Sequence, residues 1–353
     1  MPAERENLSI PAVPAWAVDR LDSALPPEPE APYFDPDLQA WVLSRHADIL
    51  AAFRASSLFP ASSNSTKPAR PMPACDHLKM RAETMEALPA ARINAWRKEL
   101  LPEAEALAAS LPVETPVELL EAYARPLCLR LAAMVTGVSL AVAAGICAAA
   151  GQISAATAEP FDSALKKSAD AANDELRQHF HSGPESLRES GFVALSQTMP
   201  CLLGNAWDAL TQHPKSWELL HRPPELMEQA VEELMRFAGL VRILGREAEA
   251  EIDLNGTRIQ KGDRIILRIF AGSRDPERFA HPNEIDIARR DAGNLMLGAG
   301  SHACVGASLI RMAAAAVTRP LVGRFALATP ASPVAWRGGS GFRFPQVLWV
   351  KLS

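Results

Sequence analysis

A glycine-rich loop around one cysteine constrains this chain more than any other feature. Residues 297–306 read LGAGSHACVG, so Cys304 lies among Gly298, Gly300 and Gly306, with His302 two positions before it. A buried structural cysteine needs no such loop, whereas glycines take positive φ and let backbone N–H groups approach a sulfur closely. Nearby N–H groups stabilise a thiolate, which is an axial donor to the iron of haem. The loop therefore favours a thiolate that serves as a ligand.

Two other interpretations of Cys304 stay open on the loop alone. A single cysteine in a protein without disulfides commonly packs as a small hydrophobic residue. His302 and Cys304 also supply two donor types that zinc accepts, although no second ligand pair follows at a spacing typical of zinc sites.

Composition narrows the class of protein. The chain has 353 residues, 48% of them hydrophobic, which is ample for a large buried core. The net charge of −5 and the lack of a basic run argue against nucleic acid as a partner. The cysteine count of 5 is odd and includes no CxxC pair, which fits a reducing compartment. The first residues, MPAERENLSIPAVPAW, show no signal-peptide pattern, so we expect a cytoplasmic protein.

One uncharged stretch is a candidate for a membrane segment. Residues 131–158 contain no charged side chain, a run longer than a spanning helix requires. Alanine, glycine, serine and threonine dominate it, and these residues gain little from lipid. Gly137 also predicts the end of one helix before another begins. We therefore expect no membrane contact.

Hydrophobic periodicity predicts a mainly helical chain with a small β component. Residues 1–32 are rich in proline and are expected to form an arm, and 57–75 reads as a long polar loop. The segment AWVLSRHADILAAF predicts a short strand and then a helix from about Asp48. Helical patterns cover 76–110, 116–136, an interrupted segment 139–190, 191–212 and 225–237. Late strands are predicted at 251–259, turning at Asn255-Gly256, and at 263–270.

A charged pair in an apolar helix adds a second constraint. In VEELMRF, Glu233 and Arg236 are three residues apart and share a helical face. Such pairs are common on exposed faces, but Val231, Leu234 and Phe237 around this one predict partial burial. A buried ion pair needs further hydrogen-bonding partners to offset its desolvation.

The helical Glu-x-x-Arg followed by Gly-x-Gly-x-His-x-Cys-x-Gly resembles the cytochrome P450 superfamily, in particular its soluble bacterial members. The stretches LGNAWDALTQHP, LNGTRIQKGDRIIL and SRDPERF agree with that family in order along the chain. The resemblance implies a mainly α fold with small β-sheets, classed α+β, as a single large haem domain over 33–353. It also implies haem b as the cofactor.

The resemblance assigns roles residue by residue. Cys304 matches the axial ligand of the haem iron, within a cofactor-binding loop that includes Gly298 and Gly300. Glu233, Arg236 and Arg289 match a buried structural cluster beside that loop. Side chains that match partners of the haem propionates are His77, Arg81, Arg246 and His302. Two carboxylates at a porphyrin edge need several charge-assisted donors, which gives this set a physical reason.

The helix that crosses the oxygen face of the haem departs from the family pattern. Aligning LGNAWDALTQHP places Thr198 at the position of the alcohol that helps to relay protons to dioxygen. Gln197 replaces the neighbouring acid, and an amide does not shuttle a proton near neutral pH. Leu195 stands where the family has glycine. Pro200 lacks an N–H, so the carbonyl of Ser196 loses its usual partner and the helix is expected to open there. The freed carbonyl would bind water, or else Pro200 reproduces a distortion that relatives make with threonine.

Two smaller departures concern packing. Leu297 stands where relatives commonly have phenylalanine, and the region between Val138 and the oxygen-face helix is short for the family. That region usually covers the substrate, so a more open pocket or an unusual substrate is expected.

The resemblance implies a monooxygenase that takes electrons from a ferredoxin or flavodoxin and inserts one oxygen atom of dioxygen into a small organic substrate. Gln197 and Leu195 keep a second class open, in which the same fold performs peroxide-driven oxidation, oxidative coupling or a haem-dependent rearrangement. A non-catalytic haem-thiolate binder is a third alternative. The sequence does not identify the substrate.

Overall fold

The computed structural model describes residues 29–60, 74–181, 187–221, 226–290, 293–337 and 339–353. Most of the predicted proline-rich arm (1–28) and most of the predicted polar loop (61–73) lie outside the described residues.

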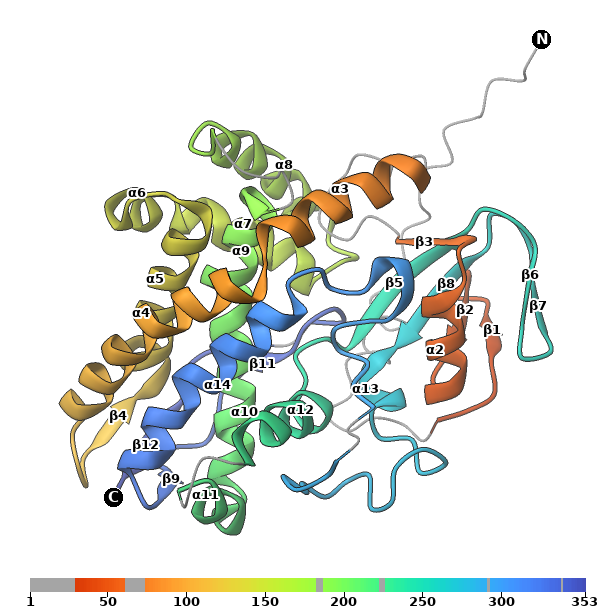
Figure 1. Ribbon diagram of the computed structural model, residues 1–353. Helices are drawn as coiled ribbons and strands as arrows, with labels where there is room; N and C mark the ends of the chain where they lie inside the picture. Colours follow the sequence, from red (N-terminus) through yellow and green to blue (C-terminus); the bar gives the residue numbers. More distant parts are fainter. Residues whose placement is uncertain (1–28, 61–73, 182–186, 222–225, 291–292, 338) are drawn as a thin grey trace.

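Helices make up most of the described chain, and Figure 1 shows them gathered on one side of the molecule. Good helix formers such as alanine and leucine fill many of them, as in the ASLIRMAAAAV run that starts the last helix. The α-helices are α2 (His46–Arg54), α3 (Ala74–Ala87), α4 (Ala90–Ser110), α5 (Arg125–Thr136), α6 (Leu140–Gly145), α7 (Cys147–Ala158), α8 (Ser163–Arg177), α9 (Glu189–Val193), α10 (Met199–Thr211), α11 (Pro214–His221), α12 (Met227–Phe237), α13 (Ile269–Gly272) and α14 (Ala307–Arg324). Two π-helical turns, η1 (Leu120–Ala124) and η3 (Ala194–Thr198), and a 3₁₀ turn, η5 (Gly300–His302), join them.

The strands form one larger sheet and three small ones. The strands are β1 (Tyr33–Asp35), β2 (Ala40–Leu43), β3 (Leu58–Pro60), β4 (Pro116–Glu118), β5 (Ile243–Ala248), β6 (Ile252–Leu254), β7 (Thr257–Ile259), β8 (Arg264–Arg268), β9 (Ala328–Pro330), β10 (Trp336–Arg337), β11 (Phe344–Pro345) and β12 (Trp349–Leu352). The larger sheet has the order β1-β2-β8-β5-β3, in which β2 and β8 are parallel and the other neighbours are antiparallel. The smaller sheets are β4-β12-β9, β10-β11 and β6-β7.

The main hydrophobic core lies among the helices. In Figure 1, α14 crosses the front of the helical part beside α4, with α10 behind it. Buried aromatic side chains tie these helices together: Trp207 of α10 donates to Thr318 Oγ1 at 3.1 Å, and the Tyr123 hydroxyl donates to the Val317 carbonyl at 2.9 Å. The helical core thus fixes α14, the helix that follows the cysteine loop.

A second core lies between the larger sheet and α2. Leu43, Ile265 and Leu267 of the sheet pack against Ile49 and Phe53 of α2. The cysteine loop lies against both cores, because Leu297 belongs to the helical core whereas Ala299 packs against the sheet core. The loop is therefore held from two sides before any ligand is considered.

Several expected elements have the expected form. The Asn255-Gly256 turn joins β6 and β7, and both residues have positive φ (53° and 87°), as a tight two-residue hairpin requires. Gly137 ends α5 in the left-handed conformation (φ 75°). The mainly helical α+β class is confirmed, since structural relatives of that class match over most of the chain, as described below.

Other expectations about the elements are wrong. The pattern over 76–110 divides into α3 and α4, because Pro89 disfavours helix at the residue before it and begins the second helix as its N-cap. The predicted helix at 116–136 begins with strand β4, which pairs with β12 from the end of the chain. Strand β3 lies inside the predicted polar loop, because it pairs with the distant β5, and local sequence does not report such pairing.

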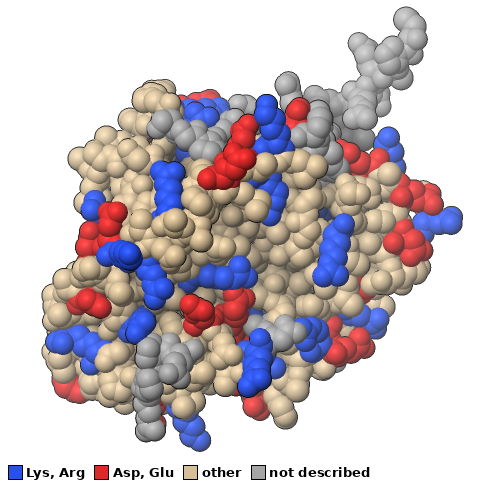
Figure 2. Space-filling view, viewed as in Figure 1, with Lys and Arg blue, Asp and Glu red and all other residues tan. Residues whose placement is uncertain are grey.

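None of the described helices combines the length and the apolar character that crossing a membrane requires. On the face drawn in Figure 2, basic and acidic side chains are interspersed among uncharged ones.

Candidate functional site

The loop before α14 holds Cys304 through a backbone conformation that requires glycine. Gly298 and Gly300 have φ of 68° and 70°, and a Cβ on Gly300 would lie 2.4 Å from the Phe53 carbonyl oxygen. Gly300 opens the 3₁₀ turn η5, and the Cys304 N–H then donates to the Leu297 carbonyl at 2.7 Å. The loop therefore closes on itself and presses against α2.

The electrostatic surroundings of Cys304 act in two directions. Burial, the largest effect, raises the pKa of its thiol, whereas the Gly306 N–H and the guanidinium groups of Arg81 and Arg311 lower it. A Cβ on Gly306 would lie 3.9 Å from the Cys304 Sγ, so the backbone approaches the sulfur closely there. Positive groups and a backbone donor around a half-buried sulfur suit a thiolate that a metal cation stabilises further.

Four basic side chains gather beside the loop. The rings of His77, from α3, and His302, from η5, lie 4.3 Å apart between centroids. Arg81 Nη1 donates to the Ala303 carbonyl at 2.5 Å. Arg246, from β5, is 6% exposed and stacks over the Phe53 ring at 5.4 Å from its centroid. Burial lowers the pKa of Arg246 to about 10, which still leaves it charged at neutral pH.

This basic cluster, defined as His77, Arg81, Arg246 and His302, brings two guanidinium groups beside two imidazoles. The pKa of His302 falls to about 4, mainly through burial and then through the neighbouring His77, Arg246 and Arg81. Half-buried cations that repel one another favour an anionic group among them. Two carboxylates on a planar ligand bound at Cys304 would supply that charge.

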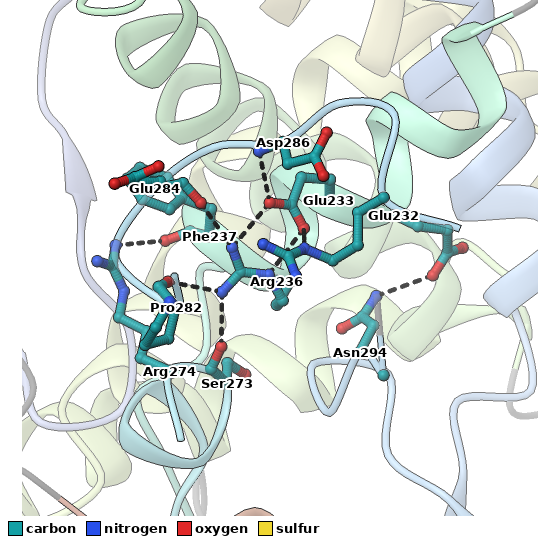
Figure 3. A network of polar contacts seen from close by, with 12 residues as sticks. Glu232, Glu233, Arg236, Phe237, Ser273, Arg274, Pro282, Glu284, Asp286 and Asn294 are labelled. Atoms are coloured by element: carbon teal, nitrogen blue, oxygen red, sulfur yellow. Dashed lines mark hydrogen bonds and ion pairs between the residues drawn. The ribbon is translucent and has the colours of Figure 1, made fainter. Parts of the chain in front are cut away.

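A fully hydrogen-bonded ion cluster lies on α12, close to the loop that leads to Cys304 (Figure 3). Glu233 and Arg236 are both 0% exposed, and two bonds of 2.7 Å join them. The remaining N–H groups of Arg236 donate to the carbonyls of Ser273, Pro282 and Glu284 at 2.8–3.0 Å. Glu233 also accepts from the Asp286 N–H at 2.9 Å and from Arg289 Nε at 3.1 Å. The structure thus brings together the three residues of the cluster expected from the sequence.

The helix that carries Thr198 changes register just before Pro200. The Met199 N–H donates to the Ala194 carbonyl, an i→i−5 bond, and residues 194–198 form the π-helical turn η3. Pro200 has no N–H and does not donate the i→i−4 hydrogen bond of a regular α-helix. The wider turn at this point accommodates the missing bond. The Cys201 thiol approaches the Gln197 carbonyl at 3.2 Å, so that carbonyl has a partner within the protein.

Gln197 faces α7. Its Nε2 lies 3.3 Å from Ser196 Oγ and 3.7 Å from Cys147 Sγ, and a Cβ on Gly151 would lie 3.7 Å from its Oε1. Thr198 is half-buried, and Leu195 is buried in the helical core. No signal in the sequence indicates that the Gln197 amide packs on another helix.

Comparison with known proteins agrees with this fold. A family model described as Cytochrome P450 matches residues 216–335, which contain both Glu233 and Cys304. The ligand-free crystal structure of Mycobacterium smegmatis CYP164A2 superimposes with a TM-score of 0.79 at 22% identity, over 91% of this chain and 93% of that chain. The complex of P450BioI with an acyl carrier protein gives 0.78 at 21% identity, over 88% and 92%.

The chain resembles cytochrome P450s by sequence in residues 216–335 and by fold over most of its length. The P450 CYP107DY1 of Priestia megaterium is 39% identical over 129 residues, which are 36% of this chain and 32% of that protein. The vitamin D(3) 25-hydroxylase of Pseudonocardia autotrophica is 27% identical over 78% of each chain. The chain thus matches about a third of the first relative's length and most of the second's.

Similarity to cytochrome P450s implies a haem, and the residues of this site fit one. Cys304 supplies a sulfur donor in a glycine loop, and the basic cluster supplies positive charge for two propionates. Within the described residues, no group of three or more His, Cys, Asp or Glu side chains is placed to hold a metal ion.

Proposed function

We propose that this P450 is a monooxygenase that inserts one oxygen atom of dioxygen into a small organic substrate. The observation that carries the proposal is the pairing of the Cys304 loop with the basic cluster. Among similar proteins are a vitamin D(3) 25-hydroxylase and a nocardicin C N-oxygenase, and both names describe oxygen insertion. The cofactor is haem b, the electrons come from a ferredoxin or flavodoxin system, and the protein is cytoplasmic.

Each residue of the site has a distinct task in this proposal. Cys304 ligates the haem iron through its sulfur. His77, Arg81, Arg246 and His302 bind the propionates, and Gly298 and Gly300 let the loop approach the ring. The Glu233–Arg236–Arg289 cluster keeps α12 and the chain before the loop in register. When bound, the haem iron supplies the activation of dioxygen.

Side chains of the protein deliver the protons that the reaction needs. The Thr198 hydroxyl donates and accepts a proton at Oγ1 on the oxygen face, next to the wider turn of η3. Gln197 does not titrate, and its amide is engaged with Ser196 and Cys147 on the side of α7. Protons therefore reach Thr198 through water, without the carboxylate that the family pattern places beside it.

A spectrum tests the proposal directly. The reduced, carbon monoxide-bound protein is expected to show the red-shifted Soret band of thiolate ligation, and Cys304→His is expected to remove it. Cys147→Ser, at another half-buried cysteine, serves as the matched control and keeps the band. An imidazole-type spectrum in the native protein would contradict the proposal.

The replacement of the acid by Gln197 favours a second candidate, peroxide-driven oxidation or another non-oxygenase reaction on the same fold. A panel of compounds turned over with a surrogate reductase pair, in parallel with hydrogen peroxide alone, separates the two. Faster product formation with the reductase supports the monooxygenase. Product only with peroxide supports the second candidate.

A further inference from the structure

A cavity of about 870 Å³ lies among α4, α12 and α14, beside the loop that holds Cys304. In Figure 1, α14 runs between the other two helices. Ala299 of the loop and Ser308 of the first turn of α14 both line the cavity. Neither Cys304 nor any member of the basic cluster is among the described residues that line it. The cavity is therefore distinct from the candidate haem site, and its volume is that of an ordinary ligand pocket.

The space stays open because of the side chains that the helices turn toward it. On α14 the lining residues recur every three or four positions, which puts them on one face: Ser308, Arg311, Met312, Ala315, Ala316 and Arg319. The RMAAAAV run thus places alanines in the middle of this face, where larger side chains would fill the space. On α4, Ile93 and Leu101 line the cavity one helical turn before and after Arg97. Apolar side chains and arginines therefore share the lining.

Cations outnumber acids around the cavity. The described residues that line it include six arginines but only two acids, Glu228 and Glu232. Two of the arginines already have acidic partners. Arg289 bonds to the buried Glu233 at 3.1 Å, and Arg311 pairs with Glu232. The pairing of Arg311 uses one of the two acids in the lining, so the other arginines have few acids within reach.

Arg97 and Arg319 supply guanidinium groups from two different helices. Each is exposed, and neither forms an ion pair with another residue that the structure describes. Because α4 and α14 pack against each other, both side chains reach the same cavity. A cation on a convex surface needs no partner, since water solvates it. A concave site lined by one sign of charge instead concentrates the field and attracts an anion.

We propose that this cavity binds a small organic anion with an apolar body and at least two negative charges, carried by carboxylate or phosphate groups. The guanidinium groups of Arg97 and Arg319 donate to the anionic groups, because their planar forks match both carboxylate and phosphate. The apolar body packs on Met312, Ala315 and Val231. The inference goes beyond the proposed function, since none of the residues assigned to haem binding or proton delivery lines this cavity.

Calorimetric titration of the haem-loaded protein with benzene-1,3,5-tricarboxylate tests the site, with benzene-1,3,5-trimethanol as the uncharged probe of similar shape. The tricarboxylate is expected to bind more tightly than the triol. Arg97→Gln and Arg319→Gln are each expected to weaken tricarboxylate binding about fivefold, the upper end for an exposed charge pair, and to leave triol binding unchanged. A parallel titration with 1-naphthyl phosphate shows which anionic group the cavity prefers.

A variant that fills the cavity separates a pocket from a charged surface. Ala315→Leu places a larger apolar side chain in the lining and changes no charge. It is expected to weaken tricarboxylate binding at least as much as either arginine variant, because the body of the ligand loses its space. If the arginine variants weaken binding and Ala315→Leu does not, the probe binds on the charged surface, and the proposal is wrong.

Arg92→Gln is the matched control on α4. The Arg92 guanidinium stacks over Trp96 at 5.0 Å and donates to the Ala87 carbonyl at 3.4 Å, and Arg92 is not among the residues that line the cavity. This variant is expected to leave both affinities unchanged, and a loss equal to that in Arg97→Gln would overturn the site.

An acidic protein partner is the competing occupant of this face. Slower reductase-driven turnover in Arg97→Gln and Arg319→Gln, with no binding of either anionic probe to the native protein, would assign the face to such a partner and overturn the proposal. Calorimetry needs no turnover, so its outcome is independent of the carbon monoxide spectrum that tests the proposed function.

Discussion

Gly300 is the residue on which the cysteine loop depends most. Its positive φ is a conformation that costs other residues about 1–2 kcal/mol. Its missing Cβ also leaves room for the Phe53 carbonyl, which a Cβ would approach to 2.4 Å. Gly298 has a similar φ of 68°, but its nearest neighbour, the Ala303 Cα, would be 3.5 Å from a Cβ, an ordinary contact.

A graded series of alanine variants separates these two effects. Gly298→Ala is expected to cost about 1–2 kcal/mol through φ alone, and Gly300→Ala clearly more, with loss of bound haem. Gly323→Ala, in the exposed last turn of α14 with no heavy atom within 4 Å of the new Cβ, is expected to stabilise the protein by about 0.5–1 kcal/mol. Urea unfolding and haem content measure the series. Equal stability for Gly300→Ala and Gly298→Ala would show that the contact with Phe53 does not matter.

The buried ion cluster gives the second residue-scale prediction. Glu233→Ala leaves Arg236 and Arg289 without their acid, and breaking a buried pair in this way costs about 3–5 kcal/mol. We expect apoprotein or little folded protein. Glu103→Ala, which breaks an exposed bridge of 3.0 Å to Arg130, is the control and is expected to cost below about 1 kcal/mol. A melting temperature unchanged by Glu233→Ala would mean that the cluster does not support the fold.

At the scale of elements, the helix that carries Thr198 shows what the sequence predicts and what it does not. Pro200 predicts a break in the helix, and the structure has the π-helical turn η3 there. The orientation of Gln197 was not predictable, because it depends on Gly151 and Cys147 of α7, whose packing on η3 no local pattern reports. The neighbouring Gln197 carbonyl accepts from the Cys201 thiol at 3.2 Å.

Restoring an acid at position 197 tests how protons reach Thr198. Gln197→Glu keeps the shape, and the hydroxyl of Ser196 and the thiol of Cys147 can turn to donate to the new carboxylate. Reductase-driven turnover is expected to rise and peroxide release to fall. Because the side chain faces α7, we expect a gain of at most about 10²-fold, the lower end for general acid–base catalysis.

Thr198→Ala is the matching variant, with peroxide release per electron as the measurement. It is expected to release more peroxide, because the hydroxyl beside η3 is gone. If neither variant changes turnover or peroxide release, these residues do not deliver protons, and the peroxide-driven alternative gains support.

At the scale of the molecule, the sequence predicted the mainly helical α+β class but not the long-range pairing of the strands. The glycine loop and the Glu233–Arg236 pair lie within short stretches, so spacing and residue type suffice to predict them. The pairing of β2 with β8 joins Trp41 to Ile265, and that of β4 with β12 joins Val117 to Val350. Such contacts depend on the whole fold.

The two hydrophobic cores make a prediction about haem removal. Cys304 packs on the helical core, whereas Arg246 comes from the sheet and stacks on Phe53 of the other core. A haem bound by both would join the two cores and neutralise the basic cluster.

The haem-free protein is therefore expected to melt at a lower temperature and in a broader transition than the haem-loaded protein, whose unfolding is expected to be a single cooperative step. Added salt is expected to raise the melting temperature of the haem-free form more, because it screens repulsion between the guanidinium groups of Arg81 and Arg246. Scanning calorimetry of both forms across a salt series measures this, with Arg246→Gln as the variant that reduces the difference. Identical salt dependence in the two forms would show that the basic cluster is not where the propionates bind.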